Sequence, residues 1–164
     1  MITYRCFRND DPPRLAEVWR TADLGPLAMQ PMTTAELEAG VFSKPYFDRR
    51  GLVVATENDQ IVGFAHAGFG PTADQKGIDT RVGSTLLAVV PPHALENEIS
   101  DQLLVRCESY LRESGATCLL GGGNDVYRGF SPGLYGGSDL PGGLDSSPKM
   151  QQTVERAAYR PQQR

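Results

Sequence analysis

Apolar residues in the sequence follow two different spacings, and each spacing predicts a different kind of element. Residues 86–90 form a continuous apolar run, long enough for a buried strand and too short for a helix. Pro91-Pro92 ends this run, because proline cannot donate to a strand ladder. From Glu96 the apolar residues recur three or four apart, and Gly115 stands where glycine commonly ends a helix. The expected apolar stripe of this helix is Ile99, Leu103, Leu104, Cys107, Tyr110 and Leu111. Residues 118–120 then read as a strand, so the stretch predicts a strand–helix–strand unit.

The same spacings divide the rest of the chain into further elements. In order, these are a strand at 2–8, a helix from Asp10, a helix from Thr33, a hairpin of strands at 51–56 and 60–70, a polar loop at 71–80, a strand at 81–90 and a last helix at 148–158. An aspartate of the Asp10-Asp11 pair is expected to cap the first helix, with proline in its first turn. Thr33 and Glu36 have the spacing of a capping box, and Asn58-Asp59 is typical of a hairpin turn.

Composition narrows the class of protein. A chain of 164 residues fits one domain with a real core, and its net charge of −4 argues against nucleic acid as a partner. Three cysteines without a Cys-x-x-Cys pair suggest reduced thiols, and His66 and His93 lack metal-ligand spacing, so we expect no metal site. We expect His66 to be a packed or surface residue of a strand, with a catalytic base as the alternative. No leader or membrane-length apolar run is present, so we expect a cytoplasmic protein without membrane contact.

The order and lengths of the elements resemble the GNAT superfamily of N-acetyltransferases over about residues 2–120. In that family, the fourth strand leads through a proline and a Gln/Arg-x-x-Gly-x-Gly/Ala loop into a long helix. Aligning Pro92 with that proline and Leu103-Leu104 with the family's helical Leu pair places the loop at residues 95–100. Leu95 stands where Gln or Arg is expected and Glu98 replaces the first glycine, whereas Ser100 is small. The resemblance implies an α/β (α+β) fold with a mixed, mostly antiparallel sheet flanked by helices.

The resemblance also implies a place for acetyl-CoA. A splayed strand would hold the pantetheine, and the loop amides and helix N-terminus would hold the pyrophosphate. The implied cofactor-binding residues are Ala88, Val89, Val90, Leu95, Glu96, Asn97, Glu98 and Ser100. Glu98 adds negative charge there, Glu96 and Asp101 flank it, and no Lys or Arg lies between residues 91 and 105 to offset them. These acids either oppose a diphosphate or simply complement the helix dipole without any ligand.

The segment from residue 121 to residue 143 is rich in glycine and carries interleaved aromatics. The aromatics are Tyr127, Phe130 and Tyr135. They either wall a substrate cleft or pin a long connection, and Tyr135 is the candidate catalytic residue. We divide the single GNAT-like domain of residues 1–164 into a core at 1–120, this loop at 121–146, and the last helix with the start of a strand at 147–164.

The last helix departs from the family at the position of its acid. The family signature there is Phe-Tyr-x-x-x-Gly-Phe/Tyr, in which the tyrosine protonates the departing CoA thiolate. Tyr159 matches the final aromatic, Ala158 replaces the glycine, and Val154 stands at the acid, where it cannot donate a proton. The family has two further strands, so we expect these last strands to be missing here. The chain would then be a truncated form or one half of a tandem GNAT protein, and a second GNAT domain or a homodimer is an expected partner.

Two functions follow. The first is transfer of acetyl from acetyl-CoA to a small-molecule or peptide amine, with atypical or lost cofactor contacts. The second is a non-catalytic GNAT-fold domain that supports a partner domain or binds another ligand. Fold-level resemblance favours the first and the eroded motifs favour the second.

Overall fold

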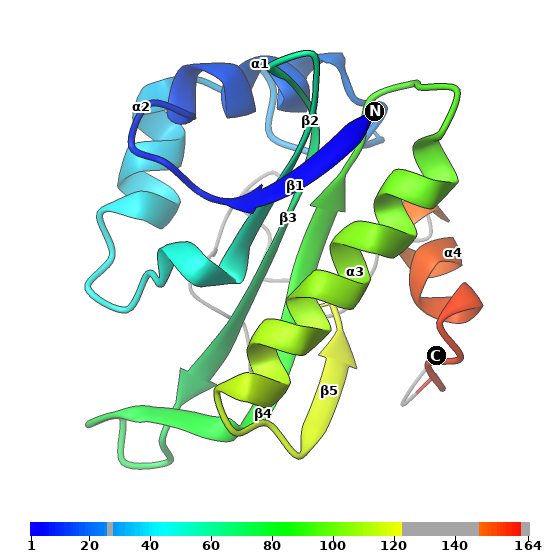
Figure 1. Ribbon diagram of the computed structural model, residues 1–164. Coiled ribbons are helices and arrows are strands. Elements are labelled where there is room, and N and C mark those ends of the chain that lie inside the picture. Colours follow the sequence, from blue (N-terminus) through cyan, green and yellow to red (C-terminus); the bar gives the residue numbers. More distant parts are fainter. Residues whose placement is uncertain (26–27, 123–147, 162–164) are drawn as a thin grey trace.

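The structure is a computed structural model that describes residues 1–25, 28–122 and 148–161 (Figure 1). Its elements are β1 (Ile2–Cys6), α1 (Pro12–Thr21), α2 (Thr34–Leu37), the π-helical turn η1 (Glu38–Phe42), the 3-10 turn η2 (Arg49–Gly51), β2 (Leu52–Glu57), β3 (Gln60–Pro71), β4 (Ile78–Val89), α3 (Glu96–Glu113), β5 (Cys118–Gly121) and α4 (Pro148–Arg156). This order confirms the succession of elements that the spacing of apolar residues predicted.

The five strands form one sheet in the order β1-β2-β3-β4-β5. The first three pairings are antiparallel, and β5 pairs with β4 in parallel. A parallel pair needs a crossover, and α3 provides it. The mixed, mostly antiparallel sheet and the strand–helix–strand unit are therefore confirmed.

The sheet separates two apolar cores, because alternate residues of each strand point to opposite faces. On one face, α1, α2 and η1 pack against Leu52, Val54 and Phe64. On the other face, α3 packs against Val53 and Ala65 (Figure 1). The expected apolar stripe of α3 is confirmed, with Ile99, Leu103, Leu104, Cys107 and Leu111 all buried and Tyr110 partly buried.

A β-bulge at Leu86 changes which way β4 presents its side chains. His66 of β3 is opposite Leu87 while the next residue, Ala67, is opposite Thr85, so Leu86 has no partner across the strands. Beyond the bulge, Leu87 and Val89 point to the α1 face, whereas Ala88 and Val90 pack on the α3 side. Pairing with β5 stops at Thr85, so among the described residues the second half of β4 pairs with β3 alone.

Two local predictions need correction. The polar segment 71–80 is not all loop, because β3 runs to Pro71 and β4 begins at Ile78, which is opposite it. Thr72 and Gly77 close a tight turn between them, with the Thr72 amide donating to the Gly77 carbonyl at 2.9 Å. Asp11 occupies the N-cap position of α1, but its side chain does not cap the helix.

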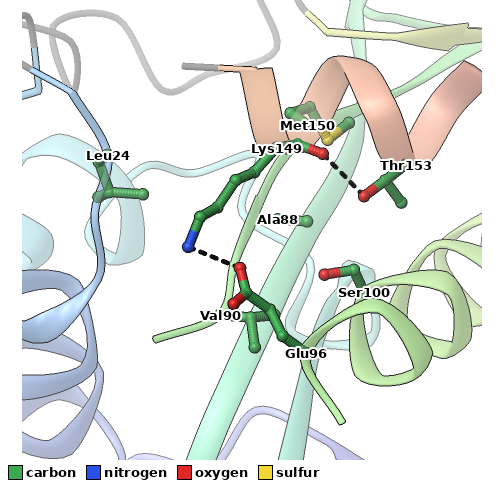
Figure 2. Close-up of a pocket in the computed structure, with 8 residues that line it drawn as sticks. All are labelled: Leu24, Ala88, Val90, Glu96, Ser100, Lys149, Met150 and Thr153. Atoms are coloured by element: carbon green, nitrogen blue, oxygen red, sulfur yellow. Dashed lines mark hydrogen bonds and ion pairs between the residues drawn. The ribbon is translucent and has the colours of Figure 1, made fainter. Parts of the chain in front are cut away.

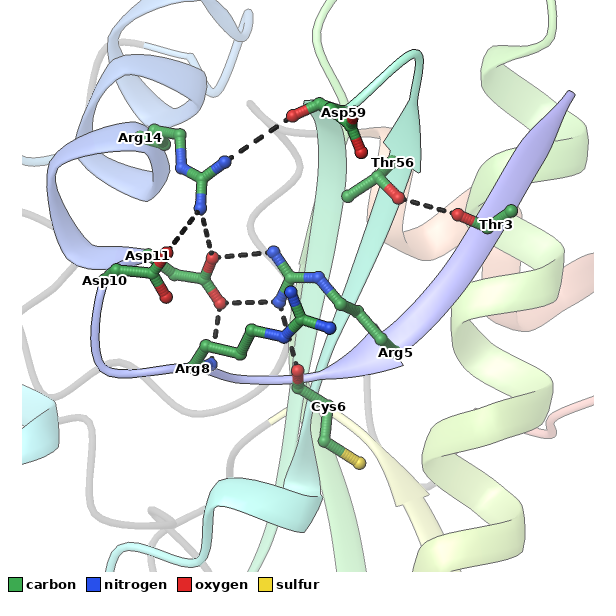
Figure 3. Close-up of polar contacts among 9 residues, drawn as sticks. All are labelled: Thr3, Arg5, Cys6, Arg8, Asp10, Asp11, Arg14, Thr56 and Asp59. Atoms are coloured by element: carbon green, nitrogen blue, oxygen red, sulfur yellow. Dashed lines mark hydrogen bonds and ion pairs between the residues drawn. The ribbon is translucent and has the colours of Figure 1, made fainter.

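Asp11 instead ties β1 to the start of α1 (Figure 3). Its fully buried carboxylate accepts two hydrogen bonds of 2.7 Å from the Arg5 guanidinium and one of 2.7 Å from the Arg8 amide. Arg14 donates to it at 3.1 Å and also reaches the carbonyl of Asp59 in the β2–β3 turn. A buried charge that is paired and hydrogen-bonded in this way fixes the corner of the fold.

The capping box and the hairpin turn are confirmed. The Glu36 amide donates to Thr33 Oγ1 at 3.2 Å, and Glu36 Oε2 accepts from the Thr33 amide at 2.7 Å. Asn58 and Asp59 both have positive φ, of 49° and 64°, as a tight hairpin turn requires.

Candidate functional site

The loop before α3 holds the helix N-terminus open to solvent. Leu95 is the N-cap residue of α3, and its side chain forms no capping hydrogen bond with the helix amides. The Leu95 amide itself donates to His93 Nδ1 at 3.0 Å. His93 Nε2 lies 3.3 Å from Glu57 Oε2, so the β2–β3 hairpin anchors the loop. The backbone amides of Asn97 and Glu98 form no hydrogen bond with any described residue. Such free amides, at the positive end of an 18-residue helix, are suited to binding an anion.

An open hollow of about 530 Å³ lies over this helix end. Its walls come from the loop, the first turn of α3 and the start of α4. The lining residues are His93, Ala94, Leu95, Glu96, Asn97, Glu98, Ser100, Lys149, Gln152 and Thr153. A volume of this size is in the range of small-ligand sites.

A second and much smaller cavity, about 10 Å³, adjoins the first between β4 and α4 (Figure 2). It has room for about one water molecule. Glu96, Ser100, Lys149 and Thr153 line both spaces, and Leu24, Ala88, Val90 and Met150 complete the smaller one. The smaller cavity lies along the part of β4 for which β3 is the one pairing partner within the described ranges.

Most of the residues implied to bind acetyl-CoA line these two spaces. Ala88 and Val90 line the small cavity, the loop residues line the hollow, and Glu96 and Ser100 line both. Val89 is the exception, because its fully buried side chain belongs to the core on the opposite face of the sheet. The bulge at Leu86 is the reason, and only the backbone of Val89 remains to face this side.

Ser100 has an unused hydroxyl at the junction of the two spaces. The residue is only 8% exposed, yet its hydroxyl forms no hydrogen bond with any residue that the structure describes. Figure 2 shows the hydroxyl directed into the space between α3 and α4. A hydroxyl that no described protein group uses can donate and accept, so this position is suited to a polar group of a ligand or water.

Two acids at the start of α3 are paired with cations of α4, which the sequence reasoning missed. Lys149 Nζ lies 2.6 Å from Glu96 Oε1, and Arg156 Nη2 lies 2.6 Å from Asp101 Oδ1. Both cations belong to α4, which is distant in sequence from residues 91–105, so the residues near the loop gave no sign of them. Glu98 is exposed, and no ion pair is found for it within the described residues. The local negative charge is therefore smaller than the sequence around α3 suggests.

The end of α4 supports the alignment with the family signature. Ala158, which replaces the family's glycine, has a φ of 62°, a conformation that glycine adopts without strain. Val154 packs over Gly121, where an added methyl group would lie 2.6 Å from Val154 Cγ1. Tyr159 donates to Glu108 Oε1 at 2.8 Å, and burial, followed by the interaction with Glu108, raises the pKa of Tyr159. On the alignment expected from the sequence, the position of the family's acid falls on the apolar side chain of Val154.

The other candidates lie elsewhere. Tyr135 and almost all of the glycine-rich loop are outside the described residues. His66 is buried beside Phe47, and burial lowers the pKa of His66 to about 4, so its imidazole is neutral at pH 7. No three His, Cys, Asp or Glu side chains come together as metal ligands in the parts of the chain that the structure describes. None of the described helices has the length and apolar character that a membrane span requires.

Comparison with known proteins supports the fold through structure alone. No protein-family model matches the sequence, and no curated protein matches it either. Among solved structures, a GNAT family acetyltransferase from Brucella melitensis in complex with acetyl-CoA is similar, with a TM-score of 0.57, 21% identity and coverage of 88% of this chain and 94% of that one.

Two other solved structures extend over nearly the whole chain. A ribosomal-protein-alanine N-acetyltransferase from Brucella melitensis biovar Abortus 2308 has a TM-score of 0.64 at 12% identity, covering 99% of this chain and 94% of that one. A transcriptional regulator from Bacillus halodurans C-125 has a TM-score of 0.65 at 16% identity, covering 100% and 96%. Sequence identities this low are evidence for the fold alone. Many of the similar structures are acetyltransferases, and several of them are named as members of the GNAT family. Together with the sheet order and the parallel β4–β5 pair, they show that this chain has the fold of the GNAT superfamily of N-acetyltransferases.

Proposed function

We propose that this chain binds acetyl-CoA in the hollow between α3 and α4 and transfers the acetyl group to a small-molecule or peptide amine. The observation that carries the proposal is the hollow itself. It brings the free amides of Asn97 and Glu98 together with the ammonium group of Lys149. Two amides at a positive helix end and one cation are complementary to a diphosphate.

The remaining contacts follow the shape of the two spaces. The pantetheine arm would run from the hollow along Ala88 and Val90, past the Ser100 hydroxyl, beside the half of β4 that pairs with β3 alone among the described residues. Backbone groups of an unpaired strand suit the amides of pantetheine, which need donors and acceptors rather than particular side chains. This path supports the use of Val89 through its backbone only.

The chemistry requires movement of one proton from the amine and one to the sulfur. The amine nitrogen attacks the thioester carbonyl, and collapse of the tetrahedral intermediate breaks the carbon–sulfur bond and releases the thiolate. A positioned acid accelerates such a step about 100- to 10,000-fold. Val154 supplies no proton, so we expect turnover to be slow unless another group, such as Tyr135, supplies it.

Two features of the site favour a second, non-catalytic function. Val154 at the acid position and the closed cavity of about 10 Å³ beside β4 favour a domain that binds a ligand without catalysis. On this alternative, the hollow over α3 still receives an anion.

Calorimetric titration of acetyl-CoA, together with mass-spectrometric detection of acetylated amines, tests the proposal. We expect micromolar binding by the parent and tighter binding by Glu98→Gly, which removes a negative side chain from the wall of the hollow. Product from a panel of amines, dependent on the protein, would support the transferase. Binding without any product would support the non-catalytic domain, and the absence of binding by both proteins would refute acetyl-CoA as the ligand.

A further inference from the structure

Two ion pairs of described residues join α3 to α4, and the pair of Glu96 and Lys149 differs from that of Asp101 and Arg156 because both of its partners line both spaces of the site. Figure 2 shows Lys149 extending from α4 to Glu96, with Ala88 of β4 and Val90, the residue after that strand, nearby. The small cavity behind the pair holds about 10 Å³. A pantetheine arm is far larger than one water molecule, so entry along β4 requires the pair to move.

The pair is also weak enough to exchange. Its side chains are 35% and 27% exposed, and ion pairs that water reaches contribute little net stability. A diphosphate carries more negative charge than one carboxylate and offers more acceptor oxygens to an ammonium group with three donors. The ammonium group therefore gains by leaving Glu96 for a diphosphate that the amides of Asn97 and Glu98 already hold.

We propose that Lys149 is the residue that recognises phosphate in this site and that Glu96 is its internal competitor. In the empty site, the ion pair closes the passage between β4 and α4. A diphosphate displaces Glu96 from Lys149 and so opens the passage beside Ala88 and Val90. This inference rests on the proposed binding of acetyl-CoA and deepens it, because it assigns the affinity of the site to one exchangeable contact.

The chain offers a matched control for this exchange. Asp101 and Arg156 also join α3 to α4, at the same distance of 2.6 Å and with similar exposure of 42% and 36%. Neither residue lines the hollow or the small cavity. Neutralising Asp101 therefore removes an equivalent link between the helices without touching the site.

The experiment measures binding of CoA, and separately of inorganic pyrophosphate, to the full chain by calorimetry. Glu96→Gln keeps the shape and removes the competitor, so we expect both probes to bind about three- to tenfold more tightly. Lys149→Met should weaken both by about tenfold. In the Lys149→Met background, Glu96→Gln should have a smaller effect, because no cation remains to be released. Asp101→Asn should stay within about twofold of the parent.

The outcomes separate this inference from the proposed function. If the parent binds CoA but Glu96→Gln has the parent's affinity for both CoA and pyrophosphate, the competitor is refuted and the function stands. If Asp101→Asn tightens binding as much as Glu96→Gln, loosening of α4 explains the effect and the inference is again refuted. If folded parent and variants all fail to bind CoA, both proposals are refuted. If Glu96→Gln binds pyrophosphate more tightly than the parent does but binds CoA with the parent's affinity, the exchange acts on a phosphate ligand without a pantetheine arm. That result would refute the passage beside Ala88 and Val90.

Discussion

At the scale of single residues, the fully buried carboxylate of Asp11 has the largest predicted effect on stability. Burial alone would raise the pKa of Asp11, but hydrogen bonds from Arg5 and from the Arg8 amide, with the charges of Arg5 and Arg14, lower it below its ordinary value. A carboxylate whose pKa is lowered by folding stabilises the fold at pH values above its unfolded pKa, about 3.9. This contribution is lost as the pH falls through the lower, folded pKa.

Asp11→Asn should therefore lower the free energy of unfolding by about 3 kcal/mol at pH 7, because it leaves Arg5 without its buried partner. Urea denaturation at pH 7 and at pH 3 checks this, and the difference from the parent should narrow at the lower pH. Asp10→Asn is the control, since Asp10 is 73% exposed and contacts Arg14 only at 3.3 Å. We expect a change below about 0.5 kcal/mol there. An equal, constant loss for Asp11→Asn at both pH values would contradict the electrostatic explanation.

At the scale of elements, Gly121 determines how closely α4 can approach β5. A methyl group at this position would lie 2.6 Å from Val154 Cγ1 and 3.4 Å from Tyr159 Cδ1. Gly121→Ala should therefore destabilise the protein by about 1–3 kcal/mol through overpacking. Because the neighbour is one valine side chain, Val154→Ala should recover part of this loss, and the double variant should be more stable than the sum of the single changes predicts.

Thermal and urea unfolding of the four proteins of this cycle measure the coupling. Gly68→Ala in β3 is the matched control, because a methyl group there meets no atom within 4 Å. Its stability should stay within about 0.5 kcal/mol of the parent. Additive effects of Gly121→Ala and Val154→Ala would show that α4 does not pack on β5 as described.

The elements also show what local sequence can and cannot predict. The stripe of α3, the capping box of Thr33 and Glu36, and the Asn58-Asp59 turn depend on neighbours within a few residues, and all three were predictable. The bulge at Leu86 was not, because a continuous apolar run carries no alternation that would reveal which side chains change face. Val89 was expected at the site through its backbone, and the side chain, about which that expectation says nothing, lies in the opposite core.

The same distinction applies to the site. The residues of the α3 loop were found through their resemblance to a motif, but the pairing of Glu96 with Lys149 depends on how α4 packs against α3. No pattern within either helix encodes that packing. A basic residue in the first turn of the last helix was a usable signal only once α4 was known to lie beside α3.

At the scale of the whole molecule, one sheet serves two apolar cores, and this predicts that they unfold together. Trp19 is the only tryptophan and is fully buried in the core beside α1, whereas Cys107 is fully buried in the core beneath α3. The strands β2, β3 and β4 contribute to both cores by alternation, so loss of one core removes the support of the other. Trp19 fluorescence and the labelling of Cys107 should give the same free energy of unfolding.

A Cys6→Ser/Cys118→Ser background makes this measurement possible, because both of those thiols are exposed and would react first. Burial raises the pKa of the Cys107 thiol, so labelling in the folded state should be very slow and should report opening of the core. If Cys107 becomes reactive at lower urea concentration than the Trp19 transition, the α3 and α4 side opens on its own. CoA should then protect Cys107 while leaving Trp19 unchanged, because the proposed ligand contacts α3 and α4 and not α1. Coincident transitions that CoA shifts together would instead show that the ligand site is coupled to the whole sheet.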